Sequence, residues 1–144
     1  MSALVLFGDS NAMDDGIAPT VVLVDDSACI RERLKELLSI GAPVRIVGEA
    51  DTAAAAISEI KTAQPDFVVL DYQLPDGTGL EVLREVRAEA PHSCFIVLTN
   101  HASAQLREAF ETAGARFFLD KSHEFGQLGK LIAGARVRPD NSPR

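Results

Sequence analysis

Five polar side chains that can do chemistry follow short apolar runs in this sequence. Asp25 and Asp26 follow VVLV, Asp71 follows FVVL, Thr99 follows FIVL, and Lys121 stands two residues after a last, shorter run. Short apolar runs bounded by turn residues are typical of strands that are buried on both faces of a parallel sheet. Ligands and reactive groups collect at the carboxyl ends of such strands. We therefore expect these five side chains to meet at one edge of a sheet.

Such a set of side chains suits a metal ion and a phosphoryl group. Carboxylates about 4 to 5 Å apart repel by on the order of 3 to 4 kcal/mol per pair at an effective dielectric constant near 20. Oxygen ligands without histidine or thiolate favour Mg²⁺, for which Mn²⁺ could substitute. Lys121 and Thr99 would bind phosphoryl oxygens. Asp71 is the natural nucleophile, because carboxylates form aspartyl-phosphate intermediates. A single Asp at a strand end, in contrast, is most often a cap or a turn residue.

The hydrophobic pattern predicts the elements that must position this site. Five apolar runs indicate strands at residues 21–24, 44–48, 67–70, 95–98 and 116–119. Helical spacing of apolar residues follows each run, and Thr78 to Glu81 matches a capping box at the start of one helix. Strands that alternate with helices require parallel pairing through right-handed crossovers. The expected fold is therefore α/β, a three-layer, doubly wound (βα)5 domain with a parallel five-stranded sheet.

The chain is expected to hold one domain with two appendages. We expect residues 1–19 to be a flexible N-terminal extension, residues 20–137 to form the domain, and residues 138–144 to be a C-terminal tail. An alternative for the extension is a strand or docking peptide made by residues 4–7. No helix-turn-helix or catalytic segment follows residue 137, so a full-length chain would act by docking to another protein.

Charge and composition argue against several classes of partner. The formal net charge is −7, whereas nucleic-acid binding depends mostly on Lys and Arg, so no direct nucleic-acid partner is expected. The longest apolar runs fall far short of the roughly 20 residues that span a bilayer. The N-terminus lacks the basic region of a secretory signal. Cys29 and Cys94 cannot form a four-ligand zinc site and are expected to be inert thiols. A cytoplasmic location without a membrane partner is the simplest expectation.

Taken together, these residues resemble the receiver domain of two-component response regulators. The set at the strand ends and the sequence DYQLPDGTG, with Pro75 four and Gly79 eight residues after Asp71, carry the resemblance, which covers about residues 20–137. It implies a flavodoxin-like fold with strand order 2-1-3-4-5. It also implies that Asp71 accepts a phosphoryl group from a phosphohistidine of a sensor histidine kinase or histidine phosphotransfer protein, with Mg²⁺ required. Such a domain is not an enzyme, since it catalyses only its own phosphorylation and dephosphorylation.

The resemblance also implies a ligand set for the metal. Asp26 and Asp71 match direct metal ligands, joined by the backbone carbonyl of Gln73. Asp25 matches a ligand that acts through a water molecule.

Further roles are implied for residues around the phosphoryl group. Thr99 and Lys121 match the residues that bind its oxygens, and Thr99 and Phe118 match the switch pair, in which the aromatic ring turns inward when the hydroxyl moves toward the phosphate. Gln73 and His101 occupy the variable positions that influence the lifetime of the phosphate. We expect these two residues to control the attacking water.

The sequence departs from the family pattern next to two of these residues. Ser122 follows Lys121 where the family usually has proline in a cis peptide, and a cis bond without proline costs roughly 3 to 4 kcal/mol. The peptide after Lys121 can therefore be cis, as in the family, or trans with a reshaped loop, and the sequence does not decide between the two. Asn100 follows Thr99 where small residues are usual, and its side chain is expected to narrow access to Asp71.

Two other functions remain alternatives. A haloacid-dehalogenase-like, Mg²⁺-dependent phosphatase also uses a strand-end Asp, a hydroxyl and a Lys, but the Asp-x-Asp pattern of that family is absent here. A scaffold receiver that is never phosphorylated would be expected to have a broken acidic pocket. For a receiver, the candidate output surface comprises the helix after the strand at 95–98, the strand at 116–119 and the helix after that strand. Its expected exposed groups include Gln105, Arg107, Glu108, Glu111 and Gln127.

Overall fold

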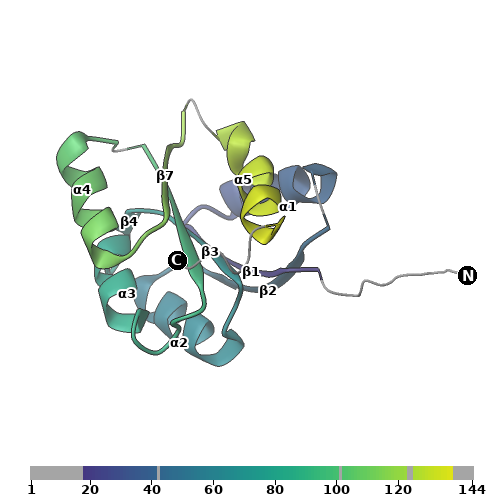
Figure 1. Ribbon diagram of the computed structural model, residues 1–144. Coiled ribbons are helices and arrows are strands. Elements are labelled where there is room, and N and C mark those ends of the chain that lie inside the picture. The colour runs from purple at the N-terminus through teal and green to yellow at the C-terminus, as the bar shows by residue number, and fades with distance from the viewer. Residues whose placement is uncertain (1–17, 42, 101, 123–124, 138–144) are drawn as a thin grey trace, which may run out of the picture.

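A central parallel sheet organises the protein (Figure 1). The computed structural model describes residues 18–41, 43–100, 102–122 and 125–137. The sheet consists of β1 (Thr20–Val24), β2 (Arg45–Ala50), β3 (Phe67–Leu70), β6 (Cys94–Thr99) and β7 (Phe117–Asp120). Its order is β2-β1-β3-β6-β7, and every pair in it is parallel. This order confirms the predicted flavodoxin-like arrangement 2-1-3-4-5.

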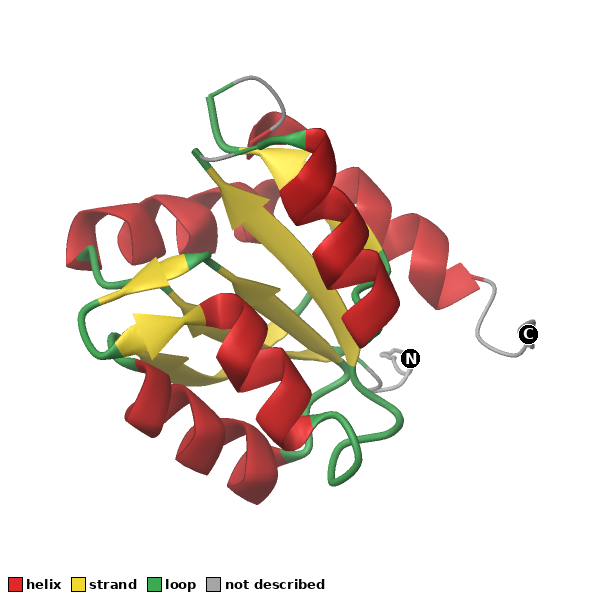
Figure 2. Ribbon diagram, turned by 90° about the vertical axis from the view of Figure 1, so that its left-hand side faces the viewer, coloured by secondary structure: helices red, strands yellow, loops and turns green. Residues whose placement is uncertain are grey.

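Helices cover both faces of the sheet (Figure 2). They are α1 (Ala28–Gly41), α2 (Ala53–Ala63), α3 (Gly79–Val86), α4 (Ala104–Ala113) and α5 (Leu128–Val137), the last preceded by a 3-10 turn, η1 (Phe125–Gln127). Helices α1 and α5 contact each other on one face. On the other face, α3 contacts both α2 and α4. The three predicted layers are therefore confirmed.

Local signals in the sequence fix where several helices begin and end. Thr78 caps α3, and its reciprocal hydrogen bonds with Glu81 form the predicted capping box. Thr52 accepts the N–H of Ala55 at the start of α2. Helix α4 ends at Gly114, whose φ of 113° lies in the left-handed region that glycine adopts readily.

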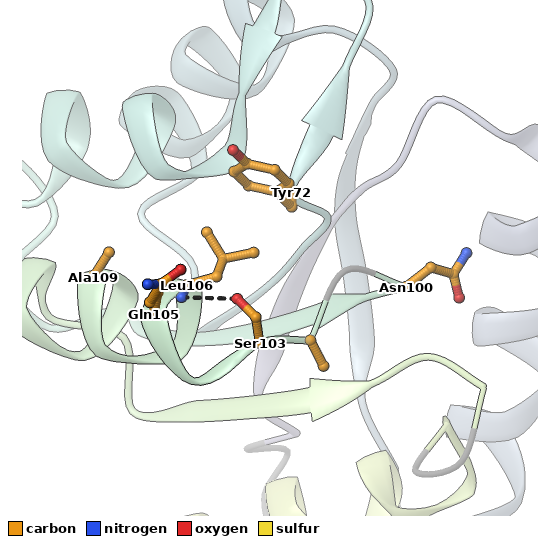
Figure 3. Close-up of a pocket in the computed structure, with 7 residues that line it drawn as sticks. Tyr72, Asn100, Ser103, Gln105, Leu106 and Ala109 are labelled. Atoms are coloured by element: carbon orange, nitrogen blue, oxygen red, sulfur yellow. Dashed lines mark hydrogen bonds between the residues drawn. The ribbon is translucent and has the colours of Figure 1, made fainter.

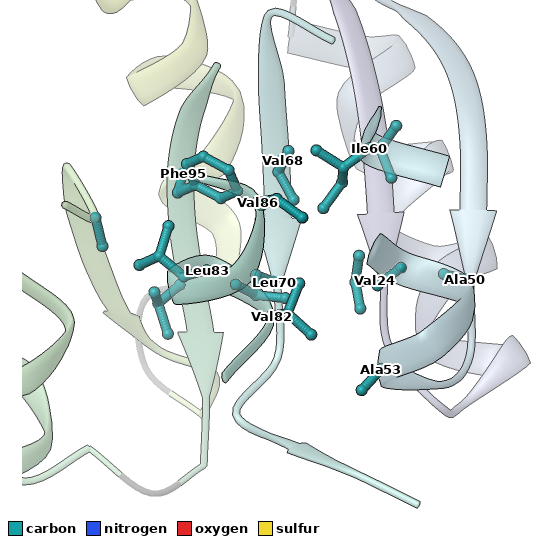
Figure 4. Packing of buried hydrophobic residues seen from close by; sticks show 14 of the residues in the cluster. Val24, Ala50, Ala53, Ile60, Val68, Leu70, Val82, Leu83, Val86 and Phe95 are labelled. Atoms are coloured by element: carbon teal, nitrogen blue, oxygen red, sulfur yellow. The ribbon is translucent and has the colours of Figure 1, made fainter. Parts of the chain in front are cut away.

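Both faces of the sheet are buried by apolar side chains. The cluster beneath α2, α3 and α4 includes the strand residues Val22, Val24, Val68, Leu70 and Val97 (Figure 4). The cluster beneath α1 and α5 includes the strand residues Val21, Leu23, Phe67, Val69, Ile96 and Leu98. Because successive strand residues point to opposite faces, the apolar runs fill both layers. In the four other strands of the sheet the residues between the strand ends are apolar, and only the edge strand β2 carries an exposed polar residue, Glu49, within its length.

The observed elements differ from the predicted ones at their margins. Strand β2 runs to Ala50, two residues beyond its expected end. A short antiparallel hairpin, β4 (Gln73–Leu74) and β5 (Gly77–Thr78), occupies the predicted loop after β3. At the N-terminal boundary, Pro19 is buried and its carbonyl accepts the N–H of Arg45. The docking peptide suggested for residues 4–7 and the tail at 138–144 lie outside the described residues.

Candidate functional site

The ends of β1 and β3 place two carboxylates side by side. Val24 pairs with Leu70 in the sheet, and the N–H of Asp71 donates to the carbonyl of Val24 at 3.1 Å. Asp25 and Asp71 each follow one of these strand ends, and only 3% and 8% of their respective surfaces are exposed. Two acidic side chains therefore lie next to each other and are almost completely buried.

Lys121 supplies the opposite charge. Its Nζ lies 2.8 Å from Asp25 Oδ2 and 3.2 Å from Asp71 Oδ2. Strand β7 positions this side chain, because the N–H of Lys121 donates to the carbonyl of Thr99 at 2.8 Å. Residues almost one hundred positions apart in the sequence therefore meet in one ion-pair cluster, as the strand-end pattern predicted.

The third carboxylate completes a group that could hold a metal ion. Asp25, Asp26 and Asp71 each offer one carboxylate oxygen, and these three oxygens lie within 4.8 Å of one another. Opposite ligands of Mg²⁺ stand about 4 Å apart, since each bond is about 2.0–2.1 Å long. The donors are all hard oxygens, and Asp26 is exposed, so an ion can enter from solvent. The chemistry of the residues therefore fits Mg²⁺, and a small closure of the three side chains would bring their oxygens to its bond length.

Burial and neighbouring charges shift the ionisation of the pair. Burial raises the pKa of Asp71, Lys121 opposes this rise, and the charge of Asp25 adds to it. For Lys121, burial lowers the pKa, but its hydrogen bonds and ion pairs with Asp25 and Asp71 more than reverse this effect, so its pKa is raised. The ammonium therefore stays charged, while the buried carboxylate lacks part of the solvation that a second cation would restore.

A pocket of about 290 Å³ opens over this cluster. It is lined by Asp25, Asp26, Ser27, Ile30, Asp71, Gln73, Asn100 and Lys121. Gln73 is exposed at the start of β4. Because it lines this pocket, the structure brings it to the acidic group. Thr99 is fully buried at the end of β6, in register with Asp120 of β7. His101 lies outside the described residues.

The loop after β3 closes tightly around Asp71. Asp71 Oδ1 accepts the N–H of Tyr72 at 2.7 Å, and the N–H of Gly79 donates to the carbonyl of Tyr72 at 2.6 Å. A Cβ at Gly79 would overlap the carbonyl oxygen of Asp71, so this closure requires glycine. Gly79 also starts α3, which ties the loop to the capping box of that helix.

The loop after β7 differs from the family pattern in its peptide geometry. The described part of the chain contains no cis peptide bond, so Lys121 and Ser122 are joined by a trans peptide. Asp120 Oδ1 accepts both the N–H of Ser122 at 2.8 Å and its hydroxyl at 2.6 Å. Lys121 nevertheless reaches both carboxylates.

Phe118 is buried in a row of three aromatic rings that ends at Tyr72, the residue after Asp71. Its ring centroid lies 5.7 Å from that of Phe110, which in turn lies 6.1 Å from Tyr72 in an edge-on arrangement. The Arg107 guanidinium lies 4.9 Å from the centroid of the Phe118 ring and donates to the Phe118 carbonyl at 3.3 Å. A cation on helix α4 therefore covers the ring that the sequence marked as a switch.

A second pocket, of about 590 Å³, adjoins the first (Figure 3). Tyr72 forms one wall, and the start of α4 with Ser103, Gln105 and Leu106 forms the other. Asn100 lines both pockets. The narrowing of access to Asp71 by its side chain stays a prediction.

The role of Arg31 at the site was not predicted from the sequence. Arg31, on α1, donates to the backbone carbonyl of Asp25 at 2.6 Å and to Glu49 Oε1 at 2.9 Å. It thus ties the acidic end of β1 to the helix that follows and to β2. Nothing in the spacing of Arg31 distinguishes it from an exposed helical arginine.

In the part of the chain that the structure describes, each helix is too short or too polar to cross a bilayer.

Comparison with known proteins gives the same relationship by sequence and by structure. The DNA-binding transcriptional activator DevR/DosR of Mycobacterium tuberculosis (strain ATCC 25618 / H37Rv) is 33% identical over 112 residues, which are 78% of this chain and 52% of that protein. A protein-glutamate methylesterase/protein-glutamine glutaminase of Nocardioides sp. is 31% identical over 119 residues, covering 81% of this chain and 32% of the relative. The chain thus spans about half of the first relative's length and about a third of the second's.

Solved structures agree. The signal receiver domain of the response regulator NarL from Mycobacterium tuberculosis superposes with a TM-score of 0.76 at 30% identity, covering 83% of this chain and 97% of that one. The response regulator domain of Thermotoga maritima CheB gives a TM-score of 0.75 at 25% identity and covers 88% of this chain and 99% of its own. Residues 21–133 match the response regulator receiver domain family. The chain belongs to this family and contains a receiver domain of a two-component response regulator.

Proposed function

We propose that this receiver domain accepts a phosphoryl group on Asp71. The observation that supports the proposal best is the ion-pair cluster, in which Lys121 Nζ lies 3.2 Å from Asp71 Oδ2 and 2.8 Å from Asp25 Oδ2. A structural ion pair would need one carboxylate. Three clustered carboxylates, of which only two pair with the ammonium, suit a site whose remaining negative charge is neutralised by a divalent cation.

The donor is a phosphohistidine of a sensor histidine kinase or a histidine phosphotransfer protein. A carboxylate oxygen of Asp71 attacks the phosphorus atom and forms a P–O bond while the P–N bond breaks. The histidine nitrogen keeps the electron pair of the broken bond and takes up a proton. Later, water attacks the phosphoryl group and returns Asp71 to its carboxylate form with release of phosphate. The domain thus acts only on itself, and the methylesterase named for one relative, of which the chain matches 32%, is not assigned to it.

The chain's own residues have separate tasks in this transfer. Asp26, Asp71 and the backbone carbonyl of Gln73 would hold Mg²⁺, and Asp25 would do so through a water molecule. When bound, Mg²⁺ offsets negative charge on the phosphoryl oxygens. Lys121 would move from the carboxylates to a phosphoryl oxygen, and the Thr99 hydroxyl would donate to another. Gln73, at the pocket, and His101 would influence how quickly water reaches the phosphorus.

The output is a change at the surface formed by α4, β7 and α5. Arg107 of α4 covers Phe118 of β7, and Thr99 is in register with Asp120 of the same strand. A movement of Thr99 toward the phosphate would therefore shift β7 and alter the contact between Arg107 and Phe118. Gln105, Arg107, Glu108, Glu111 and Gln127 are all exposed there. Phosphorylation can act only by changing the relative binding free energies of two conformations of this surface for a partner.

Labelling distinguishes this function from its rivals. The purified chain is incubated with Mg²⁺ and either acetyl phosphate or a phosphorylated histidine kinase, and intact and peptide masses are measured. We expect one phosphoryl group, on Asp71. It should be absent when EDTA is present during the reaction, and absent from the variant Asp71→Asn. The control Asp51→Asn changes another exposed carboxylate and should be labelled like the wild type. Turnover of many equivalents of a phosphate ester would support a phosphatase, and no label under any donor would support a scaffold.

A further inference from the structure

The tip of the β4–β5 hairpin is bound to the start of helix α2. Asp76, in the turn of the hairpin, accepts the N–H of Ala53 on Oδ1 at 2.6 Å and the N–H of Ala54 on Oδ2 at 3.1 Å. These are the first residues of α2, whose N–H groups have no acceptor within the helix. Both oxygens of one carboxylate are therefore used to join segments more than twenty residues apart in the sequence.

Electrostatics favours this link. The first turn of a helix carries partial positive charge, which stabilises a carboxylate. The N–H groups of Ala53 and then Ala54 lower the pKa of Asp76 accordingly. Asp76 is therefore a carboxylate near neutral pH, the form that accepts both hydrogen bonds.

The segment held by Asp76 is the one that carries Gln73. Gln73 pairs with Thr78 in the hairpin and lines the acidic pocket. Leu74 is buried in the same apolar cluster as Ala53, and Gly79 closes the far end of the segment through its bond to Tyr72. Asp76 is the polar anchor at the tip, where Pro75 and Asp76 are otherwise exposed.

We propose that Asp76 is a positioning residue for the metal site, which fixes the backbone of Gln73 at the acidic pocket by anchoring the hairpin to α2. The inference rests on the proposed function, since it is there that the Gln73 carbonyl is given a role as ligand. A simpler role would be that Asp76 only caps α2. Thr52 separates the two, because it caps the same helix through Ala55 and lies outside the hairpin.

Metal affinity and stability, measured on the same variants of the full chain, test the proposal. Tyr72 is the single tyrosine of a chain without tryptophan and follows Asp71 directly, so its fluorescence can be titrated with Mg²⁺ alone. Thermal unfolding without metal reports stability. The variants are Asp76→Ala, Asp76→Asn, Thr52→Ala and Asp51→Asn. Asp76→Asn keeps an acceptor for one N–H, and Asp51→Asn removes a carboxylate from the same end of α2.

We expect Asp76→Ala to weaken Mg²⁺ binding about tenfold, as is usual when a residue that supports a metal ligand is removed. Asp76→Asn should lie between Asp76→Ala and the wild type. Thr52→Ala should lower the unfolding temperature but change the dissociation constant less than about twofold, as should Asp51→Asn.

Three results would overturn the positioning role. One is wild-type affinity in both Asp76 variants, which would leave Asp76 as a helix cap. Another is an equal loss of affinity in Thr52→Ala, which would assign the effect to the stability of α2. The third is an equal loss in Asp51→Asn, which would assign it to charge. Absence of saturable Mg²⁺ binding in the wild type would instead overturn the proposed function and this inference together.

Discussion

Lys121 shows how a single side chain can make an acidic pocket compatible with folding. It contacts Asp25 and Asp71, each of which is buried at the end of a strand. Removal of one partner from a buried charged group is usually far more costly than replacement of the whole group by apolar residues, because the remaining charge stays buried without compensation. The ammonium is therefore needed for stability as well as for the proposed contact with a phosphoryl oxygen.

The substitution Lys121→Met tests this dual role. It keeps much of the aliphatic side chain but leaves the two carboxylates facing each other. We expect the free energy of unfolding without metal to fall by about 3 kcal/mol. Mg²⁺ should then stabilise the variant more than the wild type, because the metal no longer competes with an ammonium. Urea unfolding with and without Mg²⁺ gives both numbers.

Lys130→Met, on the exposed side of α5, is the matched control and should change the stability by less than about 0.5 kcal/mol. The interpretation is wrong if Lys121→Met is as stable as the wild type, or if both proteins gain equally from Mg²⁺.

The two cysteines should differ strongly in reactivity. Burial raises the pKa of the Cys94 thiol to about 11, with a smaller opposing influence of Arg116. At pH 8 only about 0.1% of this thiol would be thiolate, the form that reacts. Cys29 is exposed on α1. We therefore expect a thiol reagent at pH 8 to modify one cysteine rapidly and the second only slowly, and peptide mapping should identify the rapid one as Cys29.

The control for this experiment is the protein in denaturant, in which both thiols should react at similar rates. Rapid modification of Cys94 in the folded protein would show that β6 opens at its start.

At the scale of residues, the sequence predicted the site where reactive side chains follow the ends of strands. Asp25, Asp71, Thr99 and Lys121 could be placed together because the ends of parallel strands share an edge. The roles of Arg31 and Asp76 could not be predicted, since each depends on a contact between distant segments. Asp76 lies in a turn sequence and Arg31 in a helical pattern, but neither pattern indicates the distant segment that the side chain contacts.

At the scale of elements, two glycines differ in what their backbone must allow. Gly79 joins the loop after Asp71 to α3, where a Cβ would overlap the Asp71 carbonyl. Gly134 lies exposed within α5, and a Cβ there would meet nothing within 4 Å. Gly79→Ala should destabilise the protein by about 2–3 kcal/mol through the forced shift of the loop. Gly134→Ala should stabilise it by about 0.5–1 kcal/mol, because glycine is a poor helix former.

Denaturant unfolding of the two variants checks both signs with the same chemical change. If Gly79→Ala unfolds like the wild type, the loop has room to move and does not hold Asp71. If Gly134→Ala is destabilising, α5 does not present this position to solvent.

The main elements could be predicted because periodicity and caps agree. Five apolar runs, the capping box at Thr78 and the glycine after α4 together specify the order of strands and helices. The β4–β5 hairpin was missed because each strand is two residues long, too short for an alternating pattern, and Pro75 and Gly77 indicate a turn. The sequence therefore predicted the loop but not its internal pairing.

At the scale of the whole molecule, the acidic pocket should lower the stability of the metal-free protein. Asp71 is buried next to Asp25, and burial raises its pKa, so a neutral side chain suits the metal-free fold better than a carboxylate. Asp71→Asn leaves Lys121 paired with Asp25, so no new unpaired charge is created. We expect this variant to be more stable than the wild type without metal, by about 1 kcal/mol or more.

Magnesium should reverse this order. A ligand that binds only the folded state stabilises it by about 1.4 kcal/mol at ten times its dissociation constant. The wild type should gain this amount of stability. Asp71→Asn should gain little, because its side chain lacks the negative charge of the carboxylate ligand. EDTA should restore the order of stability found without metal. Thermal unfolding of both proteins and of the control Asp51→Asn, which should respond like the wild type, measures the effect. If Asp71→Asn is the less stable protein without metal and still gains fully from Mg²⁺, Asp71 is a structural carboxylate and the ion binds elsewhere.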